Sequence, residues 1–337
     1  MAELDFEKLH CFVDLHLHLD GAISLASART LARMQGITIP ESDEGVLAQL
    51  RVGKQCKDLT EFLQKFAFPC SLLQTKEAIT FAVRNLLAEL KVQGVMYAEL
   101  RFAPQKCTDG GLSQEEVVVA AIDGLHNASI PAQLILCCMR GEDNEAENEE
   151  TIAVAKKFLG KGVCAVDLAG AEKPFPTKNY VNLFAIAKRQ GVPFVIHAGE
   201  GDGAQSVRAA LDMGACRIGH GVRAAEDMTV VRHLAEQKVP LEICPTSNVC
   251  TATVARVVDL PIPLFLEHGV TVTINTDDPS VEGTDIRTEY RKIRDAFGFD
   301  REQIKQFLRN GVSASFADEI QKAEMLAEIE KEFAAIS

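Results

Sequence analysis

Eight short apolar segments alternate with stretches of helical periodicity along the 337 residues of this chain. Several of these segments are apolar on both faces, which is typical of strands in a parallel sheet that helices cover. We predict strands at residues 11–18, 95–102, 133–139, 163–168, 193–197, 217–220, 240–244 and 270–276. This alternation indicates an α/β fold, and eight strands favour a closed (β/α)8 TIM barrel over a doubly wound open sheet.

The sequence also marks the ends of several helices. Ser113-Gln-Glu-Glu116 has the form of a capping box, in which the two outer side chains satisfy N–H groups of the first turn. Gly191 and Gly214 follow the helical segments 180–190 and 207–213. Glycine there readily adopts the left-handed conformation that ends a helix.

The connection after the first predicted strand is unusually long and covers residues 23–93. Connections of this size are typically functional covers or inserted subdomains. We expect a helical insertion over the C-terminal mouth of the barrel, acting as a lid, as a stabilising element, or as both. After the eighth strand, residues 285–297 and 302–336 are predicted as extra amphipathic helices. Residues 1–337 are therefore predicted to form one barrel domain.

Net charge and hydropathy restrict the partners of the chain. A formal charge of −13 disfavours nucleic acid and anionic membranes, because either would repel the average surface. No apolar run approaches the roughly 20 residues that span a bilayer, and the N-terminus lacks the features of a signal peptide. Ten scattered cysteines without a Cys-x-x-Cys pattern are typical of buried, reduced thiols. We expect a cytoplasmic protein, a monomer or weak homo-oligomer, with a small-molecule substrate.

Titratable residues gather at the ends of the predicted strands. His16 and His18 are two residues apart on one strand, so both imidazoles leave the same face. Such a pair alone is more often a solvent-facing feature of an edge strand. However, other strand ends carry His197 and Glu200, His220, and Asp277 with Asp278. Because strand C-termini of a barrel face one shared pocket, we predict that these side chains meet there.

The donor types indicate a metal site. His16, His18, His197 and Asp277 offer three imidazoles and a carboxylate, a set suited to zinc and less selectively to iron, cobalt or manganese. These four ligands would leave room for one water, whose pKa a metal lowers toward neutrality. Glu200, three residues beyond His197, could move a proton without joining the metal.

Two further residues could serve the same reaction. His220 could orient or deprotonate the water, and Asp278 could reach the substrate or the water, since its side chain points away from that of Asp277.

Five segments then resemble the signatures of the adenosine deaminase family, a group of zinc-dependent amidohydrolase barrels. The resemblance extends over about residues 11–320, and the motifs stand in the family's order. It implies one zinc ion per chain and the hydrolytic deamination of adenosine to inosine and ammonia in purine salvage. It implies 2′-deoxyadenosine as a second substrate. The segments are His16-Leu-His-Leu-Asp-Gly21, His197-Ala-Gly-Glu200, Gly219-His-Gly221, Ile243-Cys-Pro-Thr-Ser-Asn248 and Asn275-Thr-Asp-Asp-Pro279.

The resemblance implies a role for each residue of the reaction. It makes Glu200 the proton donor to N1 of the purine and His220 the group that assists deprotonation of the water. Asp278 would orient the nucleophile and contact the purine. The implied zinc ligands are His16, His18, His197 and Asp277.

It also implies a set of substrate contacts. His18 and Asp278 would lie against the substrate, Gly170 would offer its backbone to the ring, and Asp20 would bind the ribose hydroxyl. The chain departs from the family at one wall, because Ala171 stands where relatives often carry an acid.

Other functions remain open. Relatives deaminate adenine, N6-methyl-AMP, AMP or modified nucleosides, and Asp20 favours a nucleoside because a short carboxylate leaves space for ribose. A phosphate-bearing substrate would need a basic cluster, for which Arg29 and Arg33 are the nearest candidates. A mononuclear amidohydrolase with another substrate and a silent binding protein are the remaining alternatives. The lysine that bridges two metals in other amidohydrolases is missing at the end of the fourth predicted strand, which reads Asp167-Leu-Ala-Gly170. The zinc signature of cytidine deaminases is missing from the sequence.

Overall fold

The computed structural model describes residues 4–53, 56 and 58–335. Within these residues, parallel strands form two four-stranded sheets, ordered β1-β2-β3-β4 and β5-β6-β7-β8. The strands are β1 Phe12–His18, β2 Val95–Phe102, β3 Ala132–Met139, β4 Val163–Ala169, β5 Ile196–Ala198, β6 Ile218–His220, β7 Leu241–Ile243 and β8 Val272–Ile274. Each lies within or next to a strand that the apolar segments predict.

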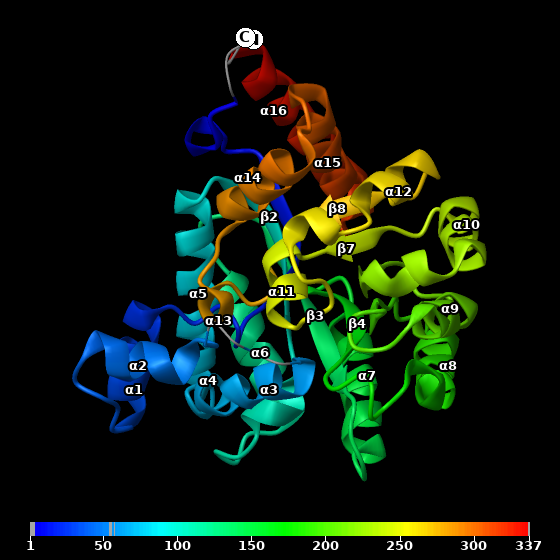
Figure 1. The fold of residues 1–337 in the computed structure, drawn as a ribbon. Coiled ribbons are helices and arrows are strands. Elements are labelled where there is room, and N and C mark those ends of the chain that lie inside the picture. The colour runs from blue at the N-terminus through cyan, green and yellow to red at the C-terminus, as the bar shows by residue number, and fades with distance from the viewer. Residues whose placement is uncertain (1–3, 54–55, 57, 336–337) are drawn as a thin grey trace.

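Two isolated bridges join these sheets at both edges. Val166 of β4 pairs with Phe194 before β5, and Leu17 of β1 pairs with Asp277 after β8. The eight strands therefore form a closed ring, which confirms the prediction of a (β/α)8 barrel. Figure 1 shows the strands at the centre of the molecule, with helices around them.

The helices that follow the strands form the outer layer. They are α5 Lys76–Val92, α6 Gln114–Leu125, α7 Glu145–Phe158, α8 Val181–Gln190, α9 Ala204–Met213, α10 Met228–Gln237, α12 Ile262–Glu267, α14 Ile286–Phe297 and α15 Arg301–Ala314. The predicted capping box of Ser113 and Glu116 opens α6. Gly191 and Gly214 end α8 and α9 in the left-handed conformation, as predicted.

The described residues also contain short elements, namely α11 Pro245–Cys250, α13 Pro279–Glu282, η1 Phe6–Lys8, η2 Gln64–Phe66, η3 Pro104–Cys107, η4 Thr177–Tyr180, η5 Val222–Glu226 and η6 Val257–Asp259.

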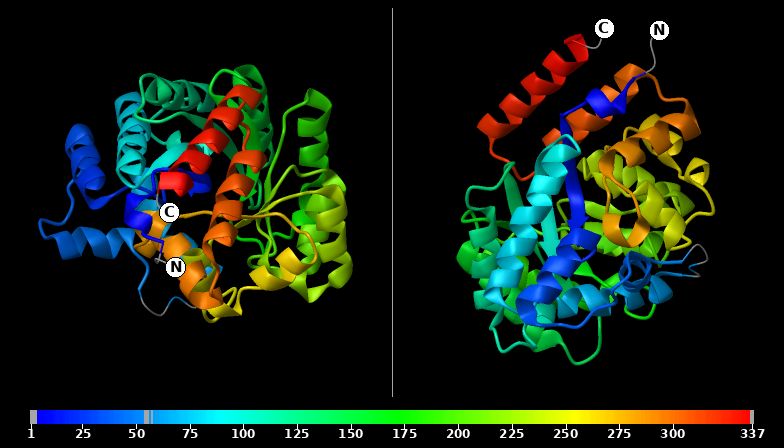
Figure 2. Two further views of the ribbon diagram at one scale, coloured as in Figure 1. Left: turned by 90° about the horizontal axis from the view of Figure 1, so that it is seen from above. Right: turned by 90° about the vertical axis from the view of Figure 1, so that its left-hand side faces the viewer.

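The long connection after β1 is helical, as expected. It contains α1 Leu25–Gln35, α2 Asp43–Leu50, α3 Leu59–Leu63 and α4 Ala67–Ser71 before α5. These helices lie at one end of the molecule, whereas α16 Glu319–Ala335 lies at the other (Figures 1 and 2). The strands run toward the inserted helices, which places the insertion beside the barrel's C-terminal mouth. That the insertion acts as a lid stays a prediction.

The prediction of one helix over residues 302–336 is wrong. The chain leaves the helix after Ala314 and starts α16 at Glu319, and Ile336 lies outside the described residues. Between them, the Phe316 N–H donates to Glu99 Oε1 at 2.6 Å, and the Phe316 ring lies 4.5 Å under the Arg217 guanidinium. A contact with the base of the barrel therefore interrupts an apolar pattern that would suit a single helix.

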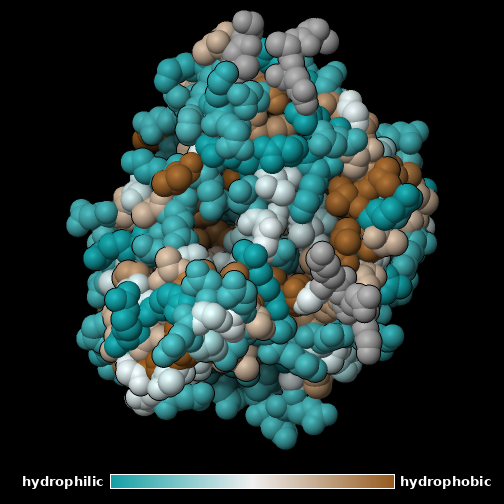
Figure 3. All heavy atoms as spheres, turned by 60° about the vertical axis from the view of Figure 1, so that its left-hand side comes forward, coloured by the Kyte–Doolittle hydropathy of each residue, from teal (hydrophilic) through white to brown (hydrophobic). Residues whose placement is uncertain are grey.

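The surface and the cysteines agree in part with what the composition predicts. None of the described helices is long and apolar enough to cross a membrane. Of the ten cysteines, six are buried, three are half-buried and Cys216 is exposed. Figure 3 shows one face of the molecule, which is mostly hydrophilic with hydrophobic residues in scattered places.

The barrel interior contains a cluster of buried charges. Arg217 lies between two carboxylates, with its Nη2 2.5 Å from Glu99 Oε2 and its Nε 2.5 Å from Glu242 Oε1. Arg101 Nη2 donates to the other Glu242 oxygen at 2.8 Å, and Arg101 Nη1 to Asp167 at 3.1 Å. All of these side chains are almost completely buried. Buried charges of this kind must be paired, because an unpaired charge would carry a large desolvation penalty.

We predict that Arg217→Met destabilises the fold by about 3–5 kcal/mol, because it leaves buried carboxylate oxygens without their cation. Urea unfolding measures the change. Arg208→Met is the control, because Arg208 pairs with Asp212 at an exposed position of α9, where ion pairs contribute at most about 1 kcal/mol. Equal stability of the two variants would contradict the interpretation.

Candidate active site and metal centre

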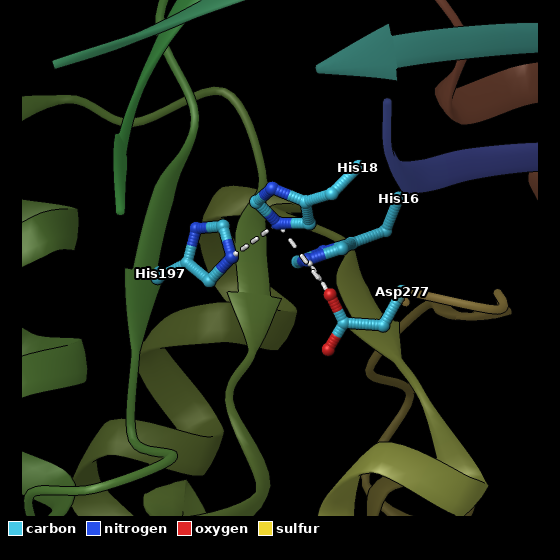
Figure 4. Close-up of side chains that lie close together, drawn as sticks. All are labelled: His16, His18, His197 and Asp277. Carbon is cyan, nitrogen blue, oxygen red and sulfur yellow. Dashed lines mark hydrogen bonds and ion pairs between the residues drawn. The ribbon is translucent and has the colours of Figure 1, made fainter. Parts of the chain in front are cut away.

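Four side chains from distant segments converge at the C-terminal end of the barrel. His16 and His18 come from β1, His197 from β5, and Asp277 from the turn after β8. One ligand atom from each lies within 4.8 Å of the others, and Figure 4 shows the side chains pointing toward one another. His18 Nε2 lies 3.2 Å from His197 Nε2, and Asp277 Oδ1 lies 3.3 Å from His16 Nε2. The structure thus brings together all four predicted ligands.

Buried carboxylates orient two of the imidazoles. His16 Nδ1 lies 2.8 Å from Glu242 Oε2, and His197 Nδ1 lies 2.8 Å from Asp167 Oδ2. A proton on each Nδ1 leaves the Nε2 lone pairs facing the cluster, as metal-binding histidines require. His16 Nε2 is buried and makes no hydrogen bond to any described residue. Nitrogen lone pairs that face each other in this way fit a cation between them.

Backbone strain marks two of the strand ends. Asp277 and His220 both have φ of 60°, the left-handed region that residues other than glycine rarely adopt. Asp277 is held there by the barrel closure, because its N–H donates to His16 O at 2.8 Å and its carbonyl accepts from His18 N at 2.9 Å. Such conformations persist where the surroundings enforce them, most often at functional sites.

His220 lies between the predicted proton donor and the predicted ligand set. Its Nε2 is 3.7 Å from Glu200 Oε2 and 3.6 Å from Asp277 Oδ2. Its Nδ1 lies 3.0 Å from Asn248 Nδ2, at the end of the segment of residues 243–248. Burial raises the pKa of Glu200, and the nearby charges of Asp277 and Glu172 raise it further. A carboxyl group with a raised pKa is suited to carry a proton near neutral pH.

A cavity of about 400 Å³ opens above these groups. Its polar part contains the predicted residues His18, Asp20, Gly170, His197, Glu200, His220, Asp277 and Asp278. One apolar wall comes from the insertion and contains Leu59, Phe62, Leu63, Phe66 and Ala67. His16 does not line the cavity and is fully buried beneath it. Every residue predicted for the site therefore lies in this cavity or directly below it.

The substrate side of the cavity holds two buried acceptors. Asp20 Oδ2 lies 3.5 Å from Cys70 Sγ, whereas Asp20 Oδ1 and Asp278 Oδ1 make no hydrogen bond to any described residue. Burial raises the pKa of both carboxyl groups. Unpaired oxygens that border a cavity are available to a ligand.

The sequence interpretation missed the residues that support the site. Asp167 and Glu242 orient histidines and Asn248 contacts His220, but none of the three was assigned a role from the sequence. One signal was present, because Asp167 and Glu242 each interrupt an apolar strand. A buried acid in a strand needs a partner.

The comparisons with known proteins agree with this geometry. The profile of the adenosine deaminase family matches residues 12–332. The chain belongs to this family. An adenosine deaminase of Haemophilus ducreyi is 45% identical over 330 residues, which cover 95% of the chain and 96% of the relative. One of Clostridium acetobutylicum is 37% identical over 324 residues, covering 94% and 96%.

A solved structure extends the family comparison to the fold. The structure of adenine deaminase from Arthrobacter aurescens has a TM-score of 0.86 to the chain at 28% identity, covering 95% of the chain and 98% of that protein. The family inferred from the five signature segments and the barrel fold inferred from the eight alternating strands are thereby confirmed. Metal dependence belongs to the family, and the histidine–aspartate cluster is in place for it.

We predict that Gly21→Ala lowers deaminase activity by about 10²-fold, because displacing a reacting group by about 1 Å has an effect of this order. A Cβ on Gly21 would lie 1.7 Å from Asp278 Oδ1, so Asp278 would have to move. Steady-state kinetics with metal content measures the effect. Gly53→Ala is the control, since its Cβ would meet nothing within 4 Å. Unchanged kinetics in Gly21→Ala would refute the assignment of Asp278.

We predict that Asp167→Asn weakens metal binding by about 10–100-fold, since the amide no longer attracts the His197 Nδ1 proton. Competition between the protein and a chelator for Zn²⁺ measures affinity directly, independently of activity. Asp212→Asn, at an exposed position of α9, is the control. Equal Zn²⁺ affinity of the Asp167 variant and the wild type would show that this carboxylate does not support the site.

Proposed function

We propose that this protein hydrolyses adenosine to inosine and ammonia, in purine salvage. One observation carries the proposal, namely that three histidines and an aspartate converge under a cavity lined by Glu200 and His220. The family membership and the 45% identity to an adenosine deaminase support the substrate. We propose 2′-deoxyadenosine as a second substrate.

The donor set supports zinc, with one ion per chain. His16, His18, His197 and Asp277 would hold it, since borderline nitrogen donors with one carboxylate are typical of this metal. When bound, the metal lowers the pKa of water and so supplies the nucleophile near neutral pH.

Glu200 and His220 move the protons. Glu200 is only 6% exposed and lines the cavity, so its carboxyl group can donate to N1 of a purine. Protonation at N1 withdraws electrons from C6 and makes that carbon accept a water oxygen. His220 takes the proton that the water loses, with Nε2 directed between Glu200 and Asp277. The amino group then leaves C6 as ammonia with the proton that His220 held, the new hydroxyl returns its proton to Glu200, and the ring keeps the oxygen as a carbonyl.

The remaining cavity groups position the substrate. Asp278 contacts the purine and the nucleophile, His18 lies against the substrate, and Gly170 contacts the ring through its backbone. Asp20 accepts the ribose hydroxyl through Oδ1, because Cys70 already contacts Oδ2. Ala171 lines the same wall without a charge.

The charges around the cavity favour a nucleoside over a nucleotide. Arg29 is bound to Asp43 and to two backbone carbonyls, away from the cavity lining. Arg140 lines the cavity, but its terminal nitrogens donate to Phe175 O, Thr177 and His197 O. Among the lining residues, this leaves Lys106, and a phosphate typically needs more than one cation.

Adenine is the second candidate substrate. The likeness to an adenine deaminase structure favours it, and the same metal chemistry would serve either purine. The difference lies in Asp20, which would have no ribose to bind.

We propose further properties that concern the whole chain. Residues 23–93 cover the mouth of one barrel domain over residues 1–337, supported by the apolar wall that α3 and α4 contribute to the cavity. The protein acts in the cytoplasm on a small molecule, as a monomer or weak homo-oligomer.

We predict that adenosine reacts fastest in a panel of adenosine, 2′-deoxyadenosine, adenine, AMP and N6-methyl-AMP, measured as ammonia release. Glu200→Gln should lower kcat for adenosine by about 10²–10⁴-fold with its metal content unchanged, because an amide cannot donate the proton. Glu149→Gln, an exposed substitution on α7, is the control. Reaction of adenine alone would reject the nucleoside, and an active Glu200→Gln would reject the proton donor.

A further inference from the structure

Glu172 is a buried carboxylate behind the cavity wall. It lies on the loop that follows β4, two residues after Gly170, and is 1% exposed. Neither the metal cluster nor the cavity of 400 Å³ includes it. A buried carboxylate needs several donors to offset the loss of water.

Those donors come from one loop. The N–H groups of four consecutive residues, Gly199, Glu200, Gly201 and Asp202, donate to the Glu172 carboxylate at 2.7, 3.0, 2.7 and 3.0 Å. The Ser206 hydroxyl, from the first turn of α9, donates as well. The carboxylate thus binds the backbone on both sides of Glu200.

The conformation of this loop depends on an external anchor. It follows β5 and forms no ladder with a neighbouring strand, so its N–H groups need another acceptor. Gly199 has φ of 74°, and a Cβ there would lie 2.5 Å from Val207 Cγ2. Thr253 Oγ1 donates to Glu200 O at 3.3 Å, and Arg223 to Gly201 O at 3.4 Å. Glu172 supplies the larger share of the hydrogen bonds.

The same anchor is connected to the strand that carries His197. Ser206 lies 2.5 Å from Thr177 Oγ1, which accepts from Arg140 Nη2 at 2.9 Å. Arg140 Nη2 also donates to His197 O at 2.6 Å. This chain of contacts fixes the loop relative to the metal-binding histidine.

We propose that Glu172 is a positioning residue for the reaction, which holds the backbone of residues 199–202 so that the Glu200 carboxyl group meets the purine ring. The inference rests on the proposed function of Glu200 and adds a residue that acts through it. Charge-assisted hydrogen bonds to the backbone are suited to this task, because they fix the loop from which the Glu200 side chain projects.

A double-mutant cycle tests this role. Glu172→Gln keeps the volume but turns an NH₂ group toward one set of donors, and should lower kcat for adenosine about 10-fold. Glu172→Ala removes every acceptor and should lower it about 10²-fold, as expected for a misplaced catalytic group. In a Glu200→Gln background, Glu172→Gln should change kcat less than 2-fold, since the group that it positions is already disabled.

A purely structural role predicts a different result. It would lower the melting temperature and leave kcat per metal-loaded protein unchanged, or it would lower kcat by the same factor in both backgrounds. Glu89→Gln is the matched control, because Glu89 accepts from Ser24, Ser27 and Asn85 in the insertion, away from Glu200. It should affect stability but not kcat.

Crystal structures of the Glu172 variants decide the inference independently of the substrate. Displacement of residues 199–202 with the metal ligands in place supports it. An unmoved loop, or equal factors in both backgrounds of the cycle, overturns it. A wild-type protein that fails to deaminate adenosine would instead reject the proposed function, and the loop position in Glu172→Gln would still test the anchor. If Glu172→Ala does not fold, Glu172→Gln carries the test alone.

Discussion

The two backbone hydrogen bonds between Asp277 and β1 join the architecture of this protein to its chemistry. They connect the last strand of the barrel to the first, and they hold Asp277 in a left-handed conformation beside His16 and His18. The hydrogen bonds that close the ring therefore also bring Asp277 to the two histidines. The remaining predicted ligand, His197, reaches the same point because parallel strands in a closed ring direct their C-terminal ends to one mouth.

Below the mouth, buried charges keep the histidines in the form that a metal requires. Glu242 and Asp167 each face an imidazole Nδ1, and Arg101 donates to both carboxylates. The Arg101 guanidinium compensates carboxylate charges that would otherwise be buried alone, and the carboxylates in turn fix which ring nitrogen carries a proton. Stability of the barrel interior and readiness of the metal site thus depend on the same contacts.

The proposed proton donor is held by a different means. The predicted ligands stand on strands or in the closure itself, whereas Glu200 stands on a loop beyond the end of β5. Its position depends on acceptors from other segments, of which the Glu172 carboxylate binds four successive N–H groups. A rigid scaffold that presents functional groups on loops needs such fixed points, because loops lack the ladders that hold strands.

Much of the fold and of the candidate site could be predicted from the sequence. Apolar runs and helix caps are local signals, and they placed the strands, the capping box at Ser113 and the glycine ends of α8 and α9. The spacing of His16 and His18 put both on one face, and the remaining titratable residues stood at strand ends. The family signatures then assigned these residues to a deaminase.

The tertiary structure alone decided which residues support the site. His16 meets Glu242 across 226 positions, and Phe316 meets Glu99 across 217, where it interrupts the predicted C-terminal helix. No periodicity encodes such pairs, because they depend on where two strands pass each other in the closed ring. Local sequence rules specify neither partner of these contacts, whereas the sequence determined the strands and the reactive groups because those follow from neighbouring residues.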